Sequence, residues 1–299
     1  MKWIKCSLFI LPVFILFSCV KGTDYNTGGG PTGPVAAQTS LDVSYGSNAA
    51  EKMDIYLPAG RSTATTKVII LLHGGAWASG DKSDFSTVQL GMTIIDTLKA
   101  RFPDYAIFNI NYRLSTGTTN LFPSQENDVK DALLSIYTNA GTYGISDKYV
   151  FIGESAGAHL AMLQAYKYIT PLKPKVVVSL FGPTDLVDMY NNPASNPANT
   201  QLLLSQTVGG TPTTNAAMYT NSSPINYITS SSPPTIFLHG SADPIVSASQ
   251  SLTAKNKLAG VGVTTQYVLY AGKGHGDDWG AGTYNDAFNK IEAFVKANM

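Results

Sequence analysis

Cysteine is nearly absent from this chain, which has two in 299 residues, Cys6 and Cys19, both within its first twenty positions. No disulfide can therefore form within the remainder of the chain. Charge is scarce as well, since charged residues make up 13% of the sequence and the formal net charge is zero. No basic cluster stands beyond the first residues, so nothing in the composition indicates a nucleic-acid partner.

The first nineteen residues have the pattern of an export signal. Lys2 and Lys5 give a positive start, and residues 8–17 form an apolar segment that is too short to span a bilayer. Residues 16–19, Leu-Phe-Ser-Cys, resemble a lipoprotein signal-peptidase site, after which Cys19 would be lipidated. We therefore expect an exported bacterial lipoprotein, in the periplasm or at the cell surface, that meets the membrane only through Cys19. An ordinary signal peptide or a retained anchor is the alternative.

The rest of the chain divides into a tether and one folded domain. Residues 20–38 are rich in glycine, proline and threonine and nearly free of apolar side chains, as in flexible linkers. Residues 39–299 remain for the fold, and a chain with 44% hydrophobic residues can bury a full core.

Strand and helix patterns alternate along this domain. Strands are predicted near 41–45, 53–57, 67–72, 105–111, 148–152, 175–181, 234–239 and 264–270, and the first two are expected to start the sheet antiparallel. Many are continuous apolar runs, which is typical of parallel strands covered on both faces. Helices are predicted near 86–101, 124–139, 155–168, 247–259 and 283–297. The alternation predicts an α/β fold with about eight strands in a mostly parallel sheet and helices on both faces.

Ser155 has the most informative surroundings in the chain. The apolar run 149–152 leads directly into Gly153-Glu154-Ser155-Ala156-Gly157, and the helix-forming residues 158–163 follow. In a strand–turn–helix with this Gly-x-Ser-x-Gly pattern the serine takes a strained conformation, and its Oγ stands exposed at the helix N-terminus. The flanking glycines leave room where a Cβ would collide with neighbouring backbone. This context predicts a nucleophilic serine.

A glycine-rich loop lies upstream of the serine. The predicted strand 67–72 ends in His73-Gly74-Gly75-Ala76-Trp77. Such a loop can turn several N–H groups toward one point, so Gly75 and Ala76, with Ala156 after the serine, are the predicted oxyanion donors. A Gly-Gly hairpin or a phosphate loop is the alternative, but no Gly-Lys-Ser/Thr follows.

The chain has only four histidines, so a catalytic base can be sought by elimination. His73 opens the glycine-rich loop and is expected to brace it. His159 lies one turn into the helix and is expected to pack in the core, while His239 ends a strand and is expected to bond to backbone. His275 follows the last predicted strand in a glycine-rich loop, at the edge where an open α/β sheet has its chemistry. His275 is therefore the predicted base.

The acid that orients His275 is predicted to be Asp243, which lies just past the penultimate strand. The chain order Ser155, Asp243, His275 is the serine–acid–histidine order of α/β-hydrolases. Asp185 follows another strand and is the competing candidate, although a helix cap suits it better. Asp277 and Asp278 are too near His275 in sequence to meet its ring easily.

Several segments, in family order, resemble the esterase/lipase superfamily of α/β-hydrolases. They are residues 73–82, 111–114, 122–130 and 143–145, the serine turn 153–157, residues 182–186, and the loops that contain Asp243 and His275. More narrowly, the chain resembles secreted bacterial carbohydrate esterases of the feruloyl and acetyl-xylan type, from about residue 40 to its end. Ala76 departs from the pattern, since many relatives have a third glycine there, but the N–H is kept.

The resemblance implies a serine esterase that uses no metal or cofactor. His275 would take the proton of Ser155 as its Oγ attacks an ester carbonyl, and water would then hydrolyse the acyl-enzyme. Residues 275–278 also lack the ligand set of a zinc site. The implied substrate is a small ester or an acylated plant polysaccharide that carries acetyl or feruloyl groups.

Other functions would use the same residues. An arylformamidase-like amide hydrolase or a peptidase would need the same triad, because leaving-group specificity depends on the pocket. A non-catalytic surface binding module would be expected to lose a triad residue, and none is lost here.

Two further features are predicted to bind substrate. Residues 185–232, crowded with Asn, Ser, Thr and Pro, form a long stretch between two strands and are predicted to be a small cap insertion that shapes the pocket. Trp77 and Trp279 bracket the predicted site in sequence and are predicted to stack on a sugar or an aromatic acyl group. The alternative for each indole is that it fills the core.

Overall fold

The computed structural model describes residues 35–87 and 93–299. The predicted signal peptide, its Cys19 and nearly all of the predicted tether lie outside the described residues, so lipidation stays a prediction. Gln38, the last residue of the predicted tether, is already the first residue of strand β1 (Gln38–Ser44).

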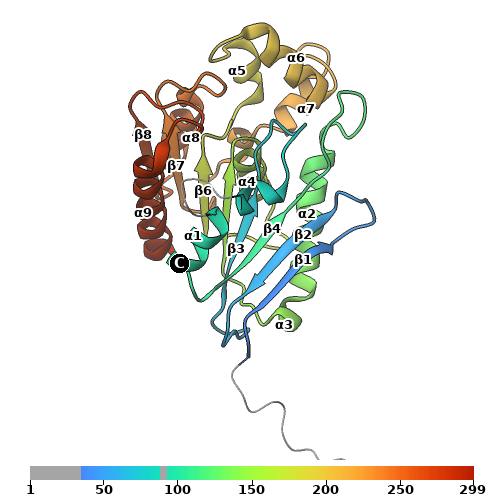
Figure 1. Cartoon of the computed structure of the whole chain (residues 1–299). Coiled ribbons are helices and arrows are strands. Elements are labelled where there is room, and N and C mark those ends of the chain that lie inside the picture. Colours follow the sequence, from blue (N-terminus) through green and yellow to red (C-terminus); the bar gives the residue numbers. More distant parts are fainter. Residues whose placement is uncertain (1–34, 88–92) are drawn as a thin grey trace, which may run out of the picture. The chain divides into compact units, whose positions relative to one another are not determined.

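The described residues form one eight-stranded sheet in the order β1-β2-β4-β3-β5-β6-β7-β8 (Figure 1). After β1 the strands are β2 (Lys52–Leu57), β3 (Lys67–Leu72), β4 (Tyr105–Ile110), β5 (Tyr149–Glu154), β6 (Val176–Leu180), β7 (Thr235–Gly240) and β8 (Thr265–Tyr270). Strand β2 pairs antiparallel with β1 and β4, and every other pairing is parallel. The predicted α/β-hydrolase sheet is thus confirmed, with each strand within three residues of its expected bounds.

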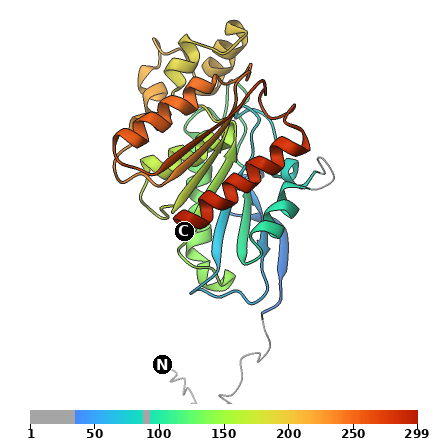
Figure 2. The same cartoon turned by 90° about the vertical axis from the view of Figure 1, so that its left-hand side faces the viewer.

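Helices outside the segment between β6 and β7 cover both faces of this sheet. They are α1 (Ile94–Arg101), α2 (Ser124–Thr138), α4 (Ala156–Lys167), α8 (Ala248–Gly260) and α9 (Gly280–Asn298), with the one-turn helix α3 (Ala140–Tyr143) after α2. Helices α1 and α9 lie on one face, and α2, α4 and α8 lie on the other (Figures 1 and 2). Strand β3 explains the two layers, because Val68, Ile70 and Leu72 enter one core cluster and Ile69 and Leu71 the other.

The predicted helix 86–101 is wrong at residues 87 and 93, which are not helical, and its residues 88–92 lie outside the described residues. A short 3-10 helix, η1 (Lys82–Ser86), precedes α1 and is capped by the Asp81 side chain. Helix α1 then begins only at Ile94, where the Thr93 hydroxyl accepts a hydrogen bond from the Asp96 N–H at 2.9 Å. The two polar caps define two separate elements because each satisfies free N–H groups at a helix start.

The predicted insertion between β6 and β7 is helical. It contains α5 (Leu186–Asn191), α6 (Pro197–Val208), α7 (Ala216–Asn221) and the 3-10 helix η2 (Pro224–Tyr227), which gather beyond the carboxyl end of β6 (Figure 1). Leu204 and Tyr219 are fully buried in the same core cluster as α4. Asp185 caps α5, as expected, through bonds from the N–H groups of Val187 and Asp188.

The parallel strands β3 to β8 bring their carboxyl ends to one edge of the sheet. The glycine-rich loop follows β3, Ser155 follows β5, and the loops with Asp243 and His275 follow β7 and β8. None of the helices in the described ranges is both long and apolar enough to cross a membrane.

Candidate active site

Ser155 is the single residue between β5 and α4, and the chain reverses direction there. Its backbone has φ +50° and ψ −117°, outside the regions that most side chains allow. The flanking glycines are sterically required: a Cβ on Gly153 would lie 2.4 Å from the backbone of Gly157, and one on Gly157 would lie 2.1 Å from the Leu72 carbonyl oxygen. The close approach of strand and helix therefore fixes the serine at the start of α4.

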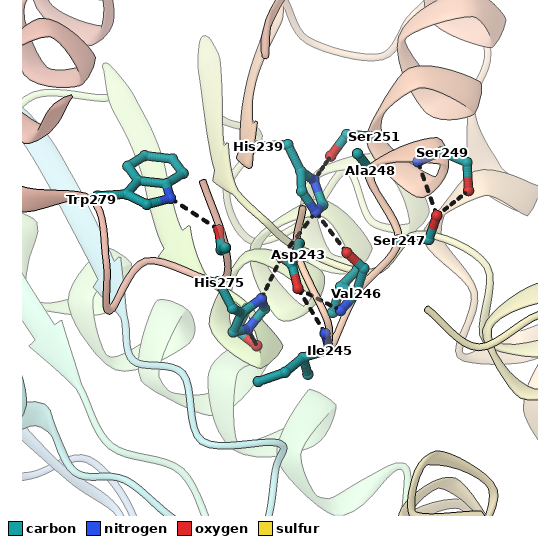
Figure 3. Close-up of polar contacts among 12 residues, drawn as sticks. His239, Asp243, Ile245, Val246, Ser247, Ala248, Ser249, Ser251, His275 and Trp279 are labelled. Carbon is teal, nitrogen blue, oxygen red and sulfur yellow. Dashed lines mark hydrogen bonds and ion pairs between the residues drawn. The ribbon is translucent and has the colours of Figure 1, made fainter. Parts of the chain in front are cut away.

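The structure brings Ser155, His275 and Asp243 together from three loops. His275 Nε2 lies 2.8 Å from Ser155 Oγ. On the other side of the ring, His275 Nδ1 lies 2.6 Å from Asp243 Oδ2 (Figure 3). The carboxylate can only accept, so Nδ1 carries a proton and Nε2 is left to accept the serine O–H. This arrangement can remove a proton from the serine and hold the resulting imidazolium.

Asp243 is fully buried and is held at both oxygens. Oδ1 accepts the N–H groups of Ile245 at 2.8 Å and Val246 at 2.9 Å, while Oδ2 faces His275. Burial alone would raise the pKa of this carboxyl group, but its contacts with His239 and His275 outweigh burial and hold the pKa well below its usual range. Asp243 therefore remains a carboxylate beside the imidazole.

The loop that carries His275 is braced by its neighbours. The Trp279 indole N–H donates to the Gly274 carbonyl at 3.0 Å, and Asp278 accepts the Gly274 N–H at 2.9 Å. The Phe181 ring lies 4.6 Å from the His275 ring, centroid to centroid, and Phe181 itself has φ +44°. These contacts limit the orientations that the imidazole can take.

The glycine-rich loop after β3 has free backbone donors. Gly75, Ala76 and Trp77 have φ values of +99°, +53° and +59°, and a Cβ on Gly75 would meet the Ser79 carbonyl oxygen at 2.1 Å. Within the described residues, the N–H groups of Gly75 and Ala76 donate no hydrogen bond. Ala156 is the first residue of α4, and the first N–H groups of a helix lack intrahelical acceptors. The three predicted oxyanion donors are thus free to serve a ligand.

His73 braces this loop, in line with its expected role. Its Nδ1 lies 2.8 Å from the Gly74 carbonyl oxygen, and its ring stacks on Tyr112 at 4.3 Å between centroids. The Tyr112 hydroxyl also donates to the His73 carbonyl at 2.8 Å.

A cavity of about 570 Å³ opens beside Ser155. The glycine-rich loop and His275 form part of its wall, and Asp84, Glu154 and Asp277 contribute carboxyl groups, with Tyr284 nearby. Burial, reinforced by the charges of Asp84 and Asp277, raises the pKa of Glu154 to about 7. The wall of the cavity is therefore acidic.

Two predictions about substrate contacts are wrong. Trp77 and Trp279 are each only 1% exposed and are absent from the cavity lining, because both indoles pack among other aromatic rings of the core. No residue of the insertion 185–232 lines the cavity either, since its apolar side chains pack against the α4 side of the sheet.

The other two histidines, His159 and His239, bond to backbone carbonyl oxygens. His159 is fully buried, and its Nε2 donates to the Ser222 carbonyl at 2.6 Å, which joins α4 to the insertion. His239 bonds to backbone, as expected, with Nε2 at 2.9 Å from the Val246 carbonyl oxygen. Its Nε2 also lies 3.2 Å from Asp243 Oδ2, a contact that the sequence analysis missed. The available signal was a histidine at the carboxyl end of a strand, four residues before the predicted acid.

The acidic cavity wall was missed as well. Glu154 was visible inside the serine motif, but Asp84 and Tyr284 come from η1 and α9, which are remote in sequence and meet only in the folded chain. In the described ranges, no group of three His, Cys, Asp or Glu side chains is arranged to hold a metal ion.

Similarity to known proteins covers most of the folded domain. Residues 53–258 match the BD-FAE family. LipM of Mycobacterium tuberculosis, named a probable carboxylic ester hydrolase, is 29% identical over 252 residues, which is 77% of this chain and 53% of LipM. A kynurenine formamidase of Danio rerio is 32% identical over 129 residues, which is 42% of this chain and 38% of the relative.

A solved structure agrees with the fold. The bifunctional GH43-CE protein of Bacteroides eggerthii superposes with a TM-score of 0.72 at 26% identity, over 87% of this chain and 38% of that one. The chain spans a little over half the length of the first curated relatives that it matches. With the family match across 53–258 and the sheet order described above, the chain belongs to the BD-FAE family and has the α/β-hydrolase fold.

Proposed function

We propose that the protein is a carboxylic ester hydrolase that forms an acyl-enzyme on Ser155. The observation that carries the proposal is the continuous contact from Ser155 Oγ through His275 to Asp243, at 2.8 and 2.6 Å, beside a cavity of about 570 Å³. Family membership and the similarity to LipM support ester hydrolysis as the reaction.

The proposed reaction has two steps. His275 Nε2 takes the serine proton while Oγ attacks the ester carbonyl, and the alcohol then leaves with the proton from His275. Water next enters, gives a proton to His275 and attacks the acyl carbon, after which Ser155 recovers its proton and the acid departs. In both steps the oxyanion would be held by the N–H groups of Gly75, Ala76 and Ala156.

We propose acetyl or feruloyl groups on plant polysaccharide as the acyl groups removed. The resemblance of the motifs to carbohydrate esterases and the similarity to the bifunctional GH43-CE protein support this substrate class. The cavity volume suits a small acyl group with part of its alcohol. The carboxyl groups of Asp84, Glu154 and Asp277 favour an uncharged acyl chain over an anionic one, because like charges repel across a confined site.

Amide hydrolysis is the second candidate, and the similarity to kynurenine formamidase favours it. The same serine, histidine and oxyanion donors would cleave an N-formyl aromatic amine, with an amine as the leaving group.

The test compares the purified full-length protein with Ser155→Ala, and with Ser231→Ala as a control at an exposed serine outside the cavity lining. Substrates are acetylated xylan, methyl ferulate and an N-formyl aromatic amine. We expect acetate or ferulate release that Ser155→Ala abolishes and Ser231→Ala retains. Turnover of the formamide alone would replace the ester assignment by amide hydrolysis. Turnover that survives Ser155→Ala would contradict the mechanism.

A further inference from the structure

His239 lies behind the acid of the proposed triad. It is fully buried near the end of β7, and its side chain faces Asp243 from the side opposite His275 (Figure 3). The mechanism above gives it no role, although a buried imidazole in contact with a buried carboxylate is costly unless every polar atom has a partner.

Each ring nitrogen of His239 has a defined partner. Nδ1 lies 2.8 Å from the Ser251 hydroxyl of α8, and Nε2 lies 2.9 Å from the Val246 carbonyl oxygen and 3.2 Å from Asp243 Oδ2. Both oxygens near Nε2 can only accept, so Nε2 carries the proton and Nδ1 accepts from Ser251. The Nε2–H is shared between two acceptors, and its contact with the Val246 carbonyl oxygen is shorter than its contact with Asp243 Oδ2.

Asp243 Oδ2 therefore faces two imidazole N–H groups, from His239 and His275, at 3.2 and 2.6 Å. Its Oδ1 is occupied by the backbone N–H groups of the following turn. We propose that His239 is a positioning residue, which fixes the orientation and the charge of Asp243 toward His275, and that Ser251 selects the required tautomer of His239. This inference rests on the proposed function.

The contact has a predictable effect on the reaction. Without the His239 N–H, Asp243 Oδ2 would keep only the N–H of His275 as an imidazole donor, so the carboxylate would be held less firmly and would attract the proton of His275 more strongly. Of the other charged groups around this chain of contacts, Asp188 of α5 accepts a hydrogen bond from the Gln250 side chain of α8 at 2.6 Å, and Glu154, Asp84 and Asp277 line the cavity on the His275 side. Asp243 is the charged side chain that contacts His239, so a change at His239 acts through Asp243.

The test uses four variants of the full-length protein. His239→Met removes every polar contact of the imidazole at similar volume, His239→Gln keeps an amide N–H, and Ser251→Ala removes the partner of Nδ1. Tyr166→Phe is the matched control, because it deletes a buried hydrogen bond, 2.8 Å to Thr235, at the other end of β7. Two rates are measured across pH: hydrolysis of p-nitrophenyl acetate, and labelling of Ser155 by a fluorophosphonate, in which Oγ displaces fluoride from phosphorus.

We expect His239→Met to lower kcat and the labelling rate by about 10- to 100-fold, the usual loss when a supporting hydrogen bond is removed from an active group. KM should change little, and the acidic limb of kcat/KM should move to higher pH. His239→Gln should recover most of the wild-type rate. The rates of Ser251→Ala should lie between those of His239→Met and the wild type. Tyr166→Phe should match the wild type.

A folded His239→Met with the rates and pH profile of Tyr166→Phe would overturn the inference alone. If His239→Met does not fold, wild-type rates in Ser251→Ala would overturn it instead. Absence of labelling at Ser155 in the wild type would overturn the proposed function along with the inference.

Discussion

Ser155 combines a strained backbone with a hydroxyl that contacts the His275 ring. Its φ of +50° would cost a residue in a loop of order 1–3 kcal/mol, and here the packing of β5 against α4 holds it in place. The strain has a chemical use, since it points Oγ at His275 instead of into the helix.

Replacement of this one side chain tests its proposed role. We expect Ser155→Ala to lower kcat by at least about 10⁴-fold with little change in the melting temperature, because the hydroxyl makes a single contact with His275. Steady-state kinetics on p-nitrophenyl acetate with parallel calorimetry would measure both quantities. A fall of less than tenfold would exclude Ser155 as the nucleophile.

Glu154 predicts a dependence of stability on pH. Its pKa is raised from 4.5 to about 7. At pH values between these two, the folded state therefore keeps a proton that the unfolded state has lost. The free energy of unfolding gains this contribution fully below about pH 4.5 and loses it as pH rises through 7. Between pH 5 and 8, the wild type should therefore lose about 2 kcal/mol relative to Glu154→Gln, after allowance for partial exposure.

Urea unfolding at several pH values would measure this difference. Glu292→Gln on α9 is the control, because bonding to Lys296 lowers the pKa of Glu292 and its contribution has the opposite sign. A wild type that gains stability over Glu154→Gln between pH 5 and 8 would contradict a raised pKa of Glu154 in the folded state.

At the scale of elements, the site depends on how closely β3, β5 and α4 approach one another. A Cβ on Gly157 would lie 2.1 Å from the Leu72 carbonyl oxygen, whereas a Cβ on Gly141 in α3 would meet nothing within 4 Å. We expect Gly157→Ala to lower the free energy of unfolding by about 3 kcal/mol and to abolish activity, because the helix must move away from the strand.

Gly141→Ala is the matched control and should be neutral or stabilising by about 0.5–1 kcal/mol, since alanine suits a helix better than glycine. Chemical denaturation measures both variants. Equal stability of the two would show that the close approach is not required.

The elements differ in how far local sequence predicts them. Strands such as β3 could be predicted within a residue or two, because a short continuous apolar run is typical of a strand that is buried on both faces of a sheet. The break before α1 was missed because it depends on the caps Asp81 and Thr93, which a periodic pattern does not reveal. The bulky Trp77 was misassigned because a tryptophan beside a catalytic motif can point to either side of its loop.

The candidate site likewise contains residues that local sequence predicts and contacts that it does not. The positions of Ser155, Asp243 and His275 follow from motifs at the ends of strands, where parallel topology brings loops together. The contact of His239 with Asp243 and the acidic wall formed with Asp84 depend on distances between elements, and no local pattern specifies those distances.

At the scale of the whole molecule, the proposed attachment to the membrane depends on one residue outside the described ranges. We expect a radiolabelled fatty acid to be incorporated into the wild type and into Cys6→Ala but not into Cys19→Ala, when the chain is expressed in a bacterial host. Only the lipidated forms should enter the detergent phase on phase separation. Labelled Cys19→Ala would contradict lipidation at Cys19.

The proposed acyl-enzyme on Ser155 can be trapped by acid quenching and located by mass spectrometry. The protein is mixed with p-nitrophenyl acetate, quenched within the first turnover, digested and mapped. We expect one acetyl group per chain on Ser155, absent from Ser155→Ala, and, where deacylation is the slower step, a burst of p-nitrophenol equal to the enzyme concentration. Acetyl on another residue, with activity retained in Ser155→Ala, would contradict the proposed acyl-enzyme.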